Sequence, residues 1–300
     1  MLIGVAAALV LVVAPLLLGL AGVLRPHRAH EDEPHDAAGW NATLTAASAL
    51  LYALAFNLTF LIQELFLVLP KALLPGVHPT LFHNNHTWSG EHPLTGLLQG
   101  SGALAILLSG LWCGWRLRRR PPAGSEWRLF LIWMSYQGLL QALLQVVVGS
   151  LNPRNDVGMA MAYLGLGAAS RAIAACVALC AIPPAALGLA RALLALAPGA
   201  AQLASARARS VFMFSVATLP GLLGVLLIIP FRLPREALEV FAPPLAVTVV
   251  GMLWMQAAAW RLRHVERAAL EPPGSLLRPL ELLIALLLVF QLLLRPGIRL

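Results

Sequence analysis

Apolar residues recur along the chain in stretches of about twenty, separated by short polar segments. A helix needs about 20 mostly apolar residues to cross the hydrocarbon core of a bilayer. The pattern therefore predicts an all-helical polytopic membrane protein, a bundle of about eight transmembrane helices that forms one domain over residues 1–300. The predicted spans are approximately Leu2–Leu24, Ala42–Leu69, Leu94–Trp115, Leu129–Leu151, Val157–Ala181, Val211–Phe231, Val240–Trp260 and Pro279–Leu294.

A shorter apolar stretch, Ala185–Ala197, follows the pair Pro183–Pro184. Proline disrupts a helix interior because it lacks an N–H and its ring clashes with the preceding turn. We therefore expect this stretch to form a separate helix at the membrane interface. The first span lacks a basic start and a clear cleavage site, so we interpret it as a membrane helix rather than a signal peptide.

The composition agrees with a membrane protein and excludes other classes. Hydrophobic residues make up 59% of the chain and charged residues 11%, whereas a soluble domain carries about 25% charged residues. The net charge of +8 comes from arginines at the ends of apolar stretches, which indicates contact with a lipid bilayer and not with nucleic acid. The three cysteines lie inside apolar stretches and form neither a disulfide framework nor a CxxC motif.

Most arginines fall in one set of loops, which includes the segments around Arg25, Arg118, Arg207 and Arg263. Loops rich in Lys and Arg stay in the cytoplasm. We therefore expect a multi-pass protein of the inner (plasma) membrane of a bacterium, with its N-terminus outside.

The segment between the second and third predicted spans holds four of the eight histidines. Pro and Gly at both of its ends and alternating residues in its middle predict a hairpin or re-entrant loop. His83 and His86 form an HxxH pair, and a turn at Asn84-Asn85 would let both imidazoles bind one metal, zinc or copper. The alternative is a polar loop whose histidines bond to backbone groups.

Polar side chains inside predicted spans are costly in a bilayer, so they face the bundle interior. Asn57 and Glu64 share one face of the second span, and Arg171 is a cation within the fifth, where we expect carboxylates or glutamine oxygens to neutralise it. Glutamine side chains form a further polar stripe that either bonds between helices or lines a path. These are Gln63 in the second span and Gln137, Gln141 and Gln145 in the fourth.

Asp156 follows Asn152-Pro153 at the start of the fifth predicted span. It either caps that helix or contributes to a site. The expected topology brings Glu64, His83, His86 and Asp156 to one membrane face, and we predict that they surround one polar cavity.

In order, these segments resemble the layout of the site-2 protease family of intramembrane zinc metalloproteases. Gln63-Glu64-Leu65-Phe66-Leu67 stands at the position of the family's HExxH, the His83 loop at that of its membrane-embedded hairpin, and Ser101–Ala105 at that of its Gly-Pro-Leu-Ala-Asn-like run. Asn152-Pro153…Asp156 stands at the third-ligand motif, so the resemblance covers about residues 55–165. It implies a general base at Glu64 and a metal ligand at Asp156 for hydrolysis within the membrane.

Both metal-binding histidines of HExxH are replaced in this chain, by Gln63 and Leu67. The chain is then either a hydrolase in which His83 and His86 supply replacement ligands, or an inactive pseudo-protease. Two other functions fit the pattern. One is a metal-handling or small-solute membrane protein, and the other is a non-catalytic assembly subunit that binds a membrane-protein partner or forms a homo-oligomer.

Overall fold

The computed structural model describes residues 2–24, 40–262, 264–268, 270–271 and 273–300. The first predicted cytoplasmic loop, with Arg25, and the position of Arg263 lie outside these residues. The elements in chain order are α1 (Leu2–Ala8), η1 (Leu9–Val13), α2 (Ala14–Val23), α3 (Ala42–Ala72), β1 (His78–Leu81), β2 (His86–Ser89), α4 (Thr95–Leu98), α5 (Ser101–Arg119), α6 (Ser125–Leu151), α7 (Asp156–Tyr163), α8 (Ala168–Leu194), α9 (Ala201–Ala204), α10 (Ala206–Met213), η3 (Phe214–Thr218), α11 (Leu219–Arg232), α12 (Ala237–Ala259), α13 (Leu277–Leu288), η4 (Val289–Leu294) and β3 (Ile298–Arg299).

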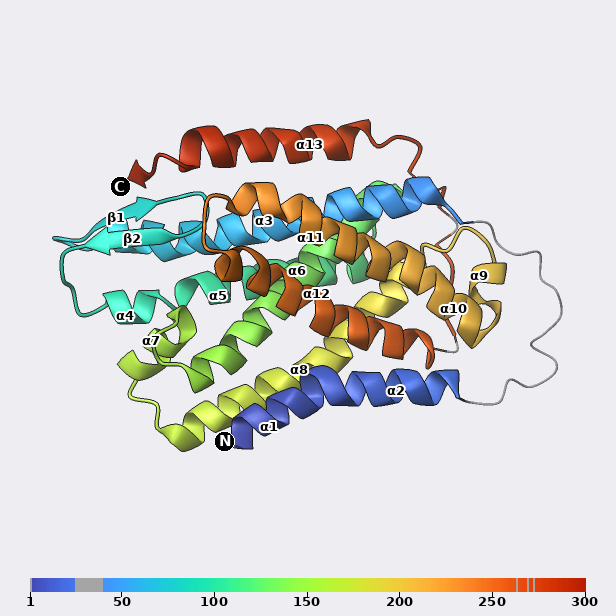
Figure 1. The fold of residues 1–300 in the computed structure, drawn as a ribbon, viewed down its shortest axis with the longest axis horizontal. Coiled ribbons are helices and arrows are strands. Elements are labelled where there is room, and N and C mark those ends of the chain that lie inside the picture. Colours follow the sequence, from blue (N-terminus) through green and yellow to red (C-terminus); the bar gives the residue numbers. More distant parts are fainter. Residues whose placement is uncertain (1, 25–39, 263, 269, 272) are drawn as a thin grey trace.

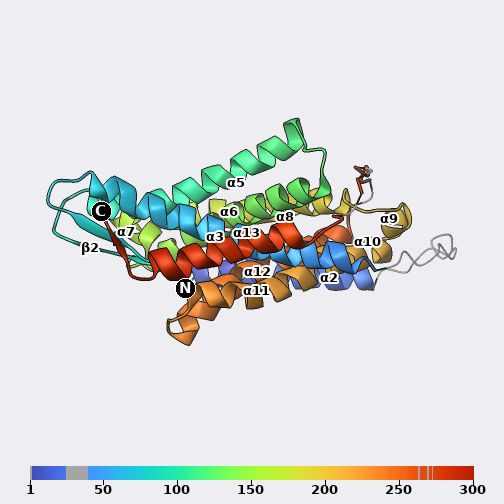
Figure 2. The same cartoon turned by 90° about the horizontal axis from the view of Figure 1, so that it is seen from above.

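The long helices lie side by side along the long axis of the molecule (Figure 1 and Figure 2). Within the described residues, eight helical stretches are long and apolar enough to cross a membrane. The all-helical polytopic fold class is confirmed. The stretches are Leu2–Val23, Ala42–Ala72, Thr95–Arg119, Ser125–Leu151, Ala168–Leu194, Ala206–Arg232, Ala237–Ala259 and Leu277–Leu294.

The fifth predicted span is wrong in its bounds. The predicted Val157–Ala181 divides into α7 and α8, because Gly165 adopts a positive φ of 64° and closes α7 with a hydrogen bond from Leu166 N to Met161 O. Pro183 and Pro184 then lie inside α8, and the predicted interfacial helix Ala185–Ala197 is mostly the end of that same helix. Prolines are tolerated in membrane helices because neighbouring helices and local adjustments satisfy the freed carbonyl groups.

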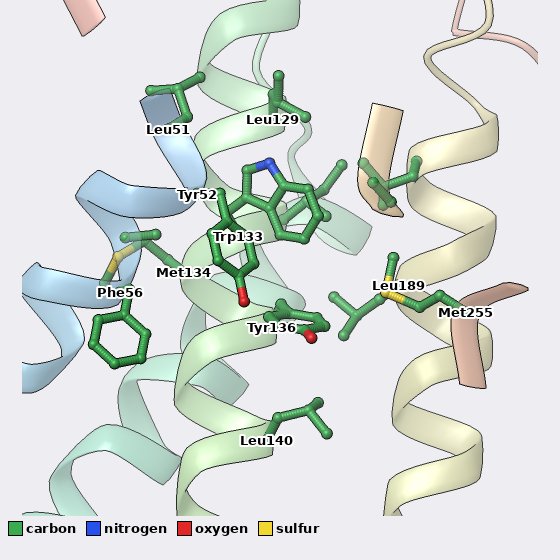
Figure 3. Close-up of a cluster of buried hydrophobic side chains, with 14 of the residues drawn as sticks. Leu51, Tyr52, Phe56, Leu129, Trp133, Met134, Tyr136, Leu140, Leu189 and Met255 are labelled. Carbon is green, nitrogen blue, oxygen red and sulfur yellow. The ribbon is translucent and has the colours of Figure 1, made fainter. Parts of the chain in front are cut away.

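The core between α3, α6, α8 and α12 contains large aromatic side chains (Figure 3). The Tyr52 hydroxyl lies 2.6 Å from Thr248 Oγ1, Trp133 Nε1 donates to Ser48 Oγ, and Tyr136 donates its hydroxyl to Val247 O. Buried Tyr and Trp need such partners, since an unpaired polar group in an apolar interior is costly. The three rings therefore contribute both apolar packing and fixed hydrogen bonds.

Two glycines let α5 and α6 approach closely. A Cβ atom built at Gly138 would lie 2.5 Å from Ile106 O, and one at Gly110 would lie 2.8 Å from Leu139 N. Small residues at such crossings allow the two backbones to touch. This close packing drives helix association in a membrane, where the lipid is as apolar as the helices and the hydrophobic effect does not bring them together. Any larger residue would push the two helices apart.

A three-stranded antiparallel sheet in the order β2-β1-β3 covers one end of the bundle. The predicted hairpin is present, but its turn is His83-Asn84, one residue earlier than predicted, because Phe82 N bonds to Asn85 O. The second neighbour of β1 comes from the far end of the chain, where Leu81 pairs with Ile298. The arginine-rich end of α5 lies at the opposite end of the bundle (Figure 2).

Candidate functional site

A buried polar cluster lies where the hairpin meets the end of α3. His86 Nδ1 is 2.8 Å from Glu64 Oε2, and the two side chains are only 8% and 7% exposed. A carboxylate only accepts hydrogen bonds, so Nδ1 of His86 carries the proton. His86 Nε2 therefore faces the other side of the cluster, where it lies 3.3 Å from Lys71 Nζ and 3.2 Å from Gln99 Oε1.

Lys71, the only lysine of the chain, is fully buried at the centre of this cluster. Its ammonium donates to Gln99 Oε1 at 2.7 Å and lies 4.2 Å from the centroid of the Trp88 ring. Trp88 in turn stacks on His86 with a centroid distance of 5.8 Å. A desolvated cation over the face of Trp is attracted by the ring quadrupole, so three groups, the His86 imidazole, the Gln99 amide oxygen and the Trp88 ring, hold this ammonium in place.

Helix and strand periodicities explain how these side chains meet. Glu64 and Lys71 are seven residues apart on α3 and share a face, and His86 and Trp88 are two apart on β2 and do the same. Gln99 just precedes α5, whose start lies directly against α3. A Cβ atom at Gly102 would come within 2.7 Å of Leu67 Cγ.

Asp156 opens α7 next to this cluster. Asn155 and not Asp156 caps the helix, because the Asn155 side chain accepts a hydrogen bond from Gly158 N. Burial raises the pKa of the Asp156 carboxyl; His86 opposes that shift, Glu64 adds to it, and Lys71 opposes it. Asp156 is therefore close enough to interact electrostatically with Glu64, His86 and Lys71, and its role as a metal ligand stays a prediction.

His83 does not join this cluster, which corrects the prediction of one cavity around four residues. Its Nε2 donates to Leu233 O at 3.0 Å, and its neighbour Asn84 donates to the carbonyl oxygens of Arg232 and Pro234. Burial lowers the pKa of the His83 imidazole, and nearby arginines lower it further against the opposing bond to Leu233. The turn thus fastens the hairpin to the loop between α11 and α12, while His86, on the strand, faces Glu64.

The separation of the two histidines affects the prediction of a metal. In the described part of the chain, no group of three or more His, Cys, Asp and Glu side chains is arranged to hold a metal ion. Zinc or copper binding by His83, His86 and Asp156 stays a prediction. The residues that sequence reasoning missed are Lys71, Trp88 and Gln99, and the one available signal was the single lysine among many arginines.

The amides inside the bundle mostly pair with one another. Gln145 Nε2 donates to Gln63 Oε1 at 2.7 Å, between α6 and α3, and Gln141 Nε2 donates to Gln137 Oε1 at 3.0 Å. Asn57 donates to Ala53 O of its own helix. These contacts favour the interpretation that the stripe bonds within and between helices.

Arg171 is not at the centre of a span, because α8 begins only at Ala168. Its Nε donates to Leu166 O at 2.9 Å, in the loop that precedes the helix. The prediction that carboxylates or glutamine oxygens neutralise Arg171 is therefore wrong. The backbone carbonyl of Leu166 accepts its hydrogen bond, and the side chain is only partly buried.

The cluster of Glu64, Lys71, His86, Trp88 and Gln99, with Asp156 beside it, brings ionisable side chains of α3 and β2 into direct contact in the described part of the chain. Comparisons of this chain with protein-family models, with curated proteins and with solved structures found no match.

Proposed function

We propose that this integral membrane protein is a pseudo-protease, an assembly subunit that holds partner segments without hydrolysing them and in which Lys71 replaces the metal ion. The observation that carries the proposal is the contact of the buried Lys71 ammonium with His86 Nε2 at 3.3 Å. The resemblance to intramembrane metalloproteases supports the proposal, because in that family a metal ion occupies the corresponding position.

The order of contacts supports this interpretation. A histidine that binds a metal commonly donates its other N–H to a carboxylate, which orients the ring. Here Glu64 accepts from His86 Nδ1, and the ammonium takes the place of the cation at Nε2. The site therefore keeps a carboxylate, an imidazole and a cation in contact one after another, and the cation is the ammonium of Lys71 instead of a metal ion.

This arrangement lacks what hydrolysis requires. A catalytic zinc keeps an open position for water and lowers its pKa to about 7, whereas an ammonium only donates hydrogen bonds. Glu64, at the general-base position of the resemblance, accepts a bond from His86 at 2.8 Å. Its carboxylate serves to orient the imidazole and not to activate water.

The sheet supplies a surface for the partner. The order β2-β1-β3 leaves β2 at an edge of the sheet, next to the cluster through His86 and Trp88. Extended peptides bind such edges by adding a strand, and Thr87 and Ser89 on this strand are exposed. An extended segment of another membrane protein fits this edge.

The test removes the internal cation. In purified protein reconstituted in nanodiscs, we expect wild type to contain no zinc after dialysis and to leave a model transmembrane peptide intact. Lys71→Ala exposes Nε2 of His86 and the oxygen of Gln99 beside Asp156, so we expect zinc uptake and a zinc-dependent rise in Tm. The variant Lys71→Ala with His86→Ala is the matched control and should lose both effects.

Three results would contradict the proposal. One is tightly held zinc in the wild type, another is peptide cleavage that Glu64→Gln abolishes, and the third is a folded Lys71→Ala that takes up no zinc. Lys71→Arg keeps a cation at the position and should remain zinc-free. If Lys71→Ala does not fold, Lys71→Arg decides, because zinc uptake in that variant would mean that the internal cation does not exclude the metal.

A further inference from the structure

An open apolar groove lies between α3, α6 and α13, far from the polar cluster. Its volume is about 290 Å³. The groove is lined by Leu51 and Leu54 of α3, Phe130 of α6, and Leu282, Leu286 and Val289 of α13 and η4. Helix α13 packs along α3 (Figure 1), and Leu282 is exposed where the groove opens.

Two opposite charges stand at one end of this groove. Glu126 is in the first turn of α6 and Arg278 in the first turn of α13, and both line the groove together with Trp127. Both helices start at the bundle end opposite the sheet. Neither charged side chain makes a hydrogen bond or an ion pair with another residue that the structure describes, so both are available to a ligand.

The size of the groove fits one hydrocarbon chain. If a methylene group is about as large as a water molecule, whose share of liquid volume is about 30 Å³, the groove takes about ten methylene groups. A transmembrane helix has a diameter of about 10 Å with its side chains and is far too large. The exposed indole of Trp127 marks the level at which Trp sits among lipid headgroups.

The charge pair defines the headgroup. Arg278 matches a phosphate, which guanidinium binds through two parallel hydrogen bonds. Glu126 matches a primary ammonium that donates hydrogen bonds to its carboxylate. A headgroup with phosphate alone would leave Glu126 unpaired beside a second anion, and a quaternary ammonium has no N–H to donate.

We propose that this groove binds one acyl chain of a phospholipid that carries a phosphoethanolamine headgroup, with Arg278 on the phosphate and Glu126 on the ammonium. This site does not depend on Lys71 or on the proposed function, so either proposal can fail alone. Phosphatidylethanolamine is the lipid to which the proposal commits, and the other phospholipids are outcomes of the test.

The experiment measures which lipid stays bound. Protein in nanodiscs of equal parts phosphatidylethanolamine, phosphatidylglycerol and phosphatidylcholine is transferred to detergent, and native mass spectrometry counts the retained lipids. We expect wild type to retain phosphatidylethanolamine over each of the others by about tenfold, roughly what one charge-assisted hydrogen bond supplies. Glu126→Gln should lose this preference, and Arg278→Gln should lose retention.

Further variants test the binding of the acyl chain and the recognition of the headgroup charge separately. Ala285→Trp fills the groove from an exposed position without touching the charged pair, so it should abolish retention while the protein stays folded. Glu126→Arg should reverse the preference toward phosphatidylglycerol. Arg191→Gln, an exposed arginine at the same end of the bundle but outside the groove, is the matched control and should behave as wild type.

Equal retention of the three lipids by wild type would overturn the proposal. So would phosphatidylethanolamine retention that survives Ala285→Trp, because the lipid would then be bound elsewhere. A preference for phosphatidylglycerol in the wild type would show that Arg278 acts alone and that Glu126 takes no part.

Discussion

A double-mutant cycle on Glu64 and His86 would measure whether their contact stabilises the bundle as strongly as a hydrogen bond to a charged carboxylate does. The two side chains are more than nine-tenths buried and meet at 2.8 Å. Neutral hydrogen bonds between membrane helices contribute about 0.6 kcal/mol on average in such cycles. A hydrogen bond to a charged group contributes about 1.5–3 kcal/mol, so the two cases differ enough to be distinguished.

We expect a coupling free energy of about 2 kcal/mol between Glu64→Leu and His86→Phe. His86→Phe should cost more than the coupling itself, about 3–5 kcal/mol, because it leaves the buried Glu64 carboxylate without its partner. Glu64→Leu leaves the buried N–H of a neutral imidazole unpaired and should cost about 1–3 kcal/mol. Reversible unfolding of the protein in bicelles gives the free energy of unfolding for wild type, both single variants and the double variant. Singles that unfold completely would be replaced by Glu64→Gln, which keeps the shape of the side chain, and by His86→Gln, which keeps a polar side chain of similar size.

The adjacent pair Gln63 and Gln145 is a matched control for this cycle. It joins α3 to α6 at 2.7 Å and carries no charge, so its coupling should be about 0.6 kcal/mol. A Glu64–His86 coupling no larger than that of the glutamine pair would refute the reasoning. The contact would then be an ordinary neutral hydrogen bond, and the order carboxylate, imidazole and cation would lose its electrostatic basis.

Three further outcomes follow from the geometry. Arg171→Leu should cost less than about 1 kcal/mol in the free energy of unfolding, because within the described residues the arginine donates one hydrogen bond, to Leu166 O just before the start of α8. A larger loss would mean a buried ionic role. Gly138→Val should cost at least about 1–3 kcal/mol by overpacking, whereas Gly19→Ala, which has no atom within 4 Å of its Cβ position, should be neutral or stabilising in thermal unfolding. Burial lowers the pKa of His83, so the folded state favours its neutral form. The contribution of this residue to stability is present above pH about 6.5, the unfolded pKa, and is lost as the pH falls toward the lower pKa of the folded state. His83→Asn should therefore flatten this part of the curve of unfolding free energy against pH, compared with wild type.

The eight spans were predictable because a helix needs about 20 consecutive apolar residues to cross the bilayer, and runs of that length can be seen directly in the sequence. The same pattern placed the fifth span wrongly because nothing in its apolar residues distinguishes a helix break at Gly165 from a glycine inside a helix, and only the positive φ does so. Paired prolines were equally ambiguous, since neighbouring helices decide whether such a helix continues.

The site was predictable in part for a similar reason. Glu64 and His86 stand out as ionisable residues near one membrane face, and topology brings them to the same end. Sequence could not assign His83 and His86 to different neighbours, because a shift of one residue in a hairpin turn reverses the face to which each strand side chain points. The sequence does not show that Lys71 is buried, because its burial depends on contacts with residues that lie far from it in the chain.

The position of β1 in the sheet has a consequence for biogenesis. A chain made at the ribosome emerges and folds from its N-terminal part onward, yet β1 receives its second neighbour from residues 298 and 299. The hairpin that carries His86 thus gains its full set of backbone pairings only after the eighth apolar helix has been synthesised and inserted. A nascent bundle that stalled before residues 298 and 299 were made would leave this edge of β1 without its partner strand, and such unpaired edges make partly folded chains prone to aggregation.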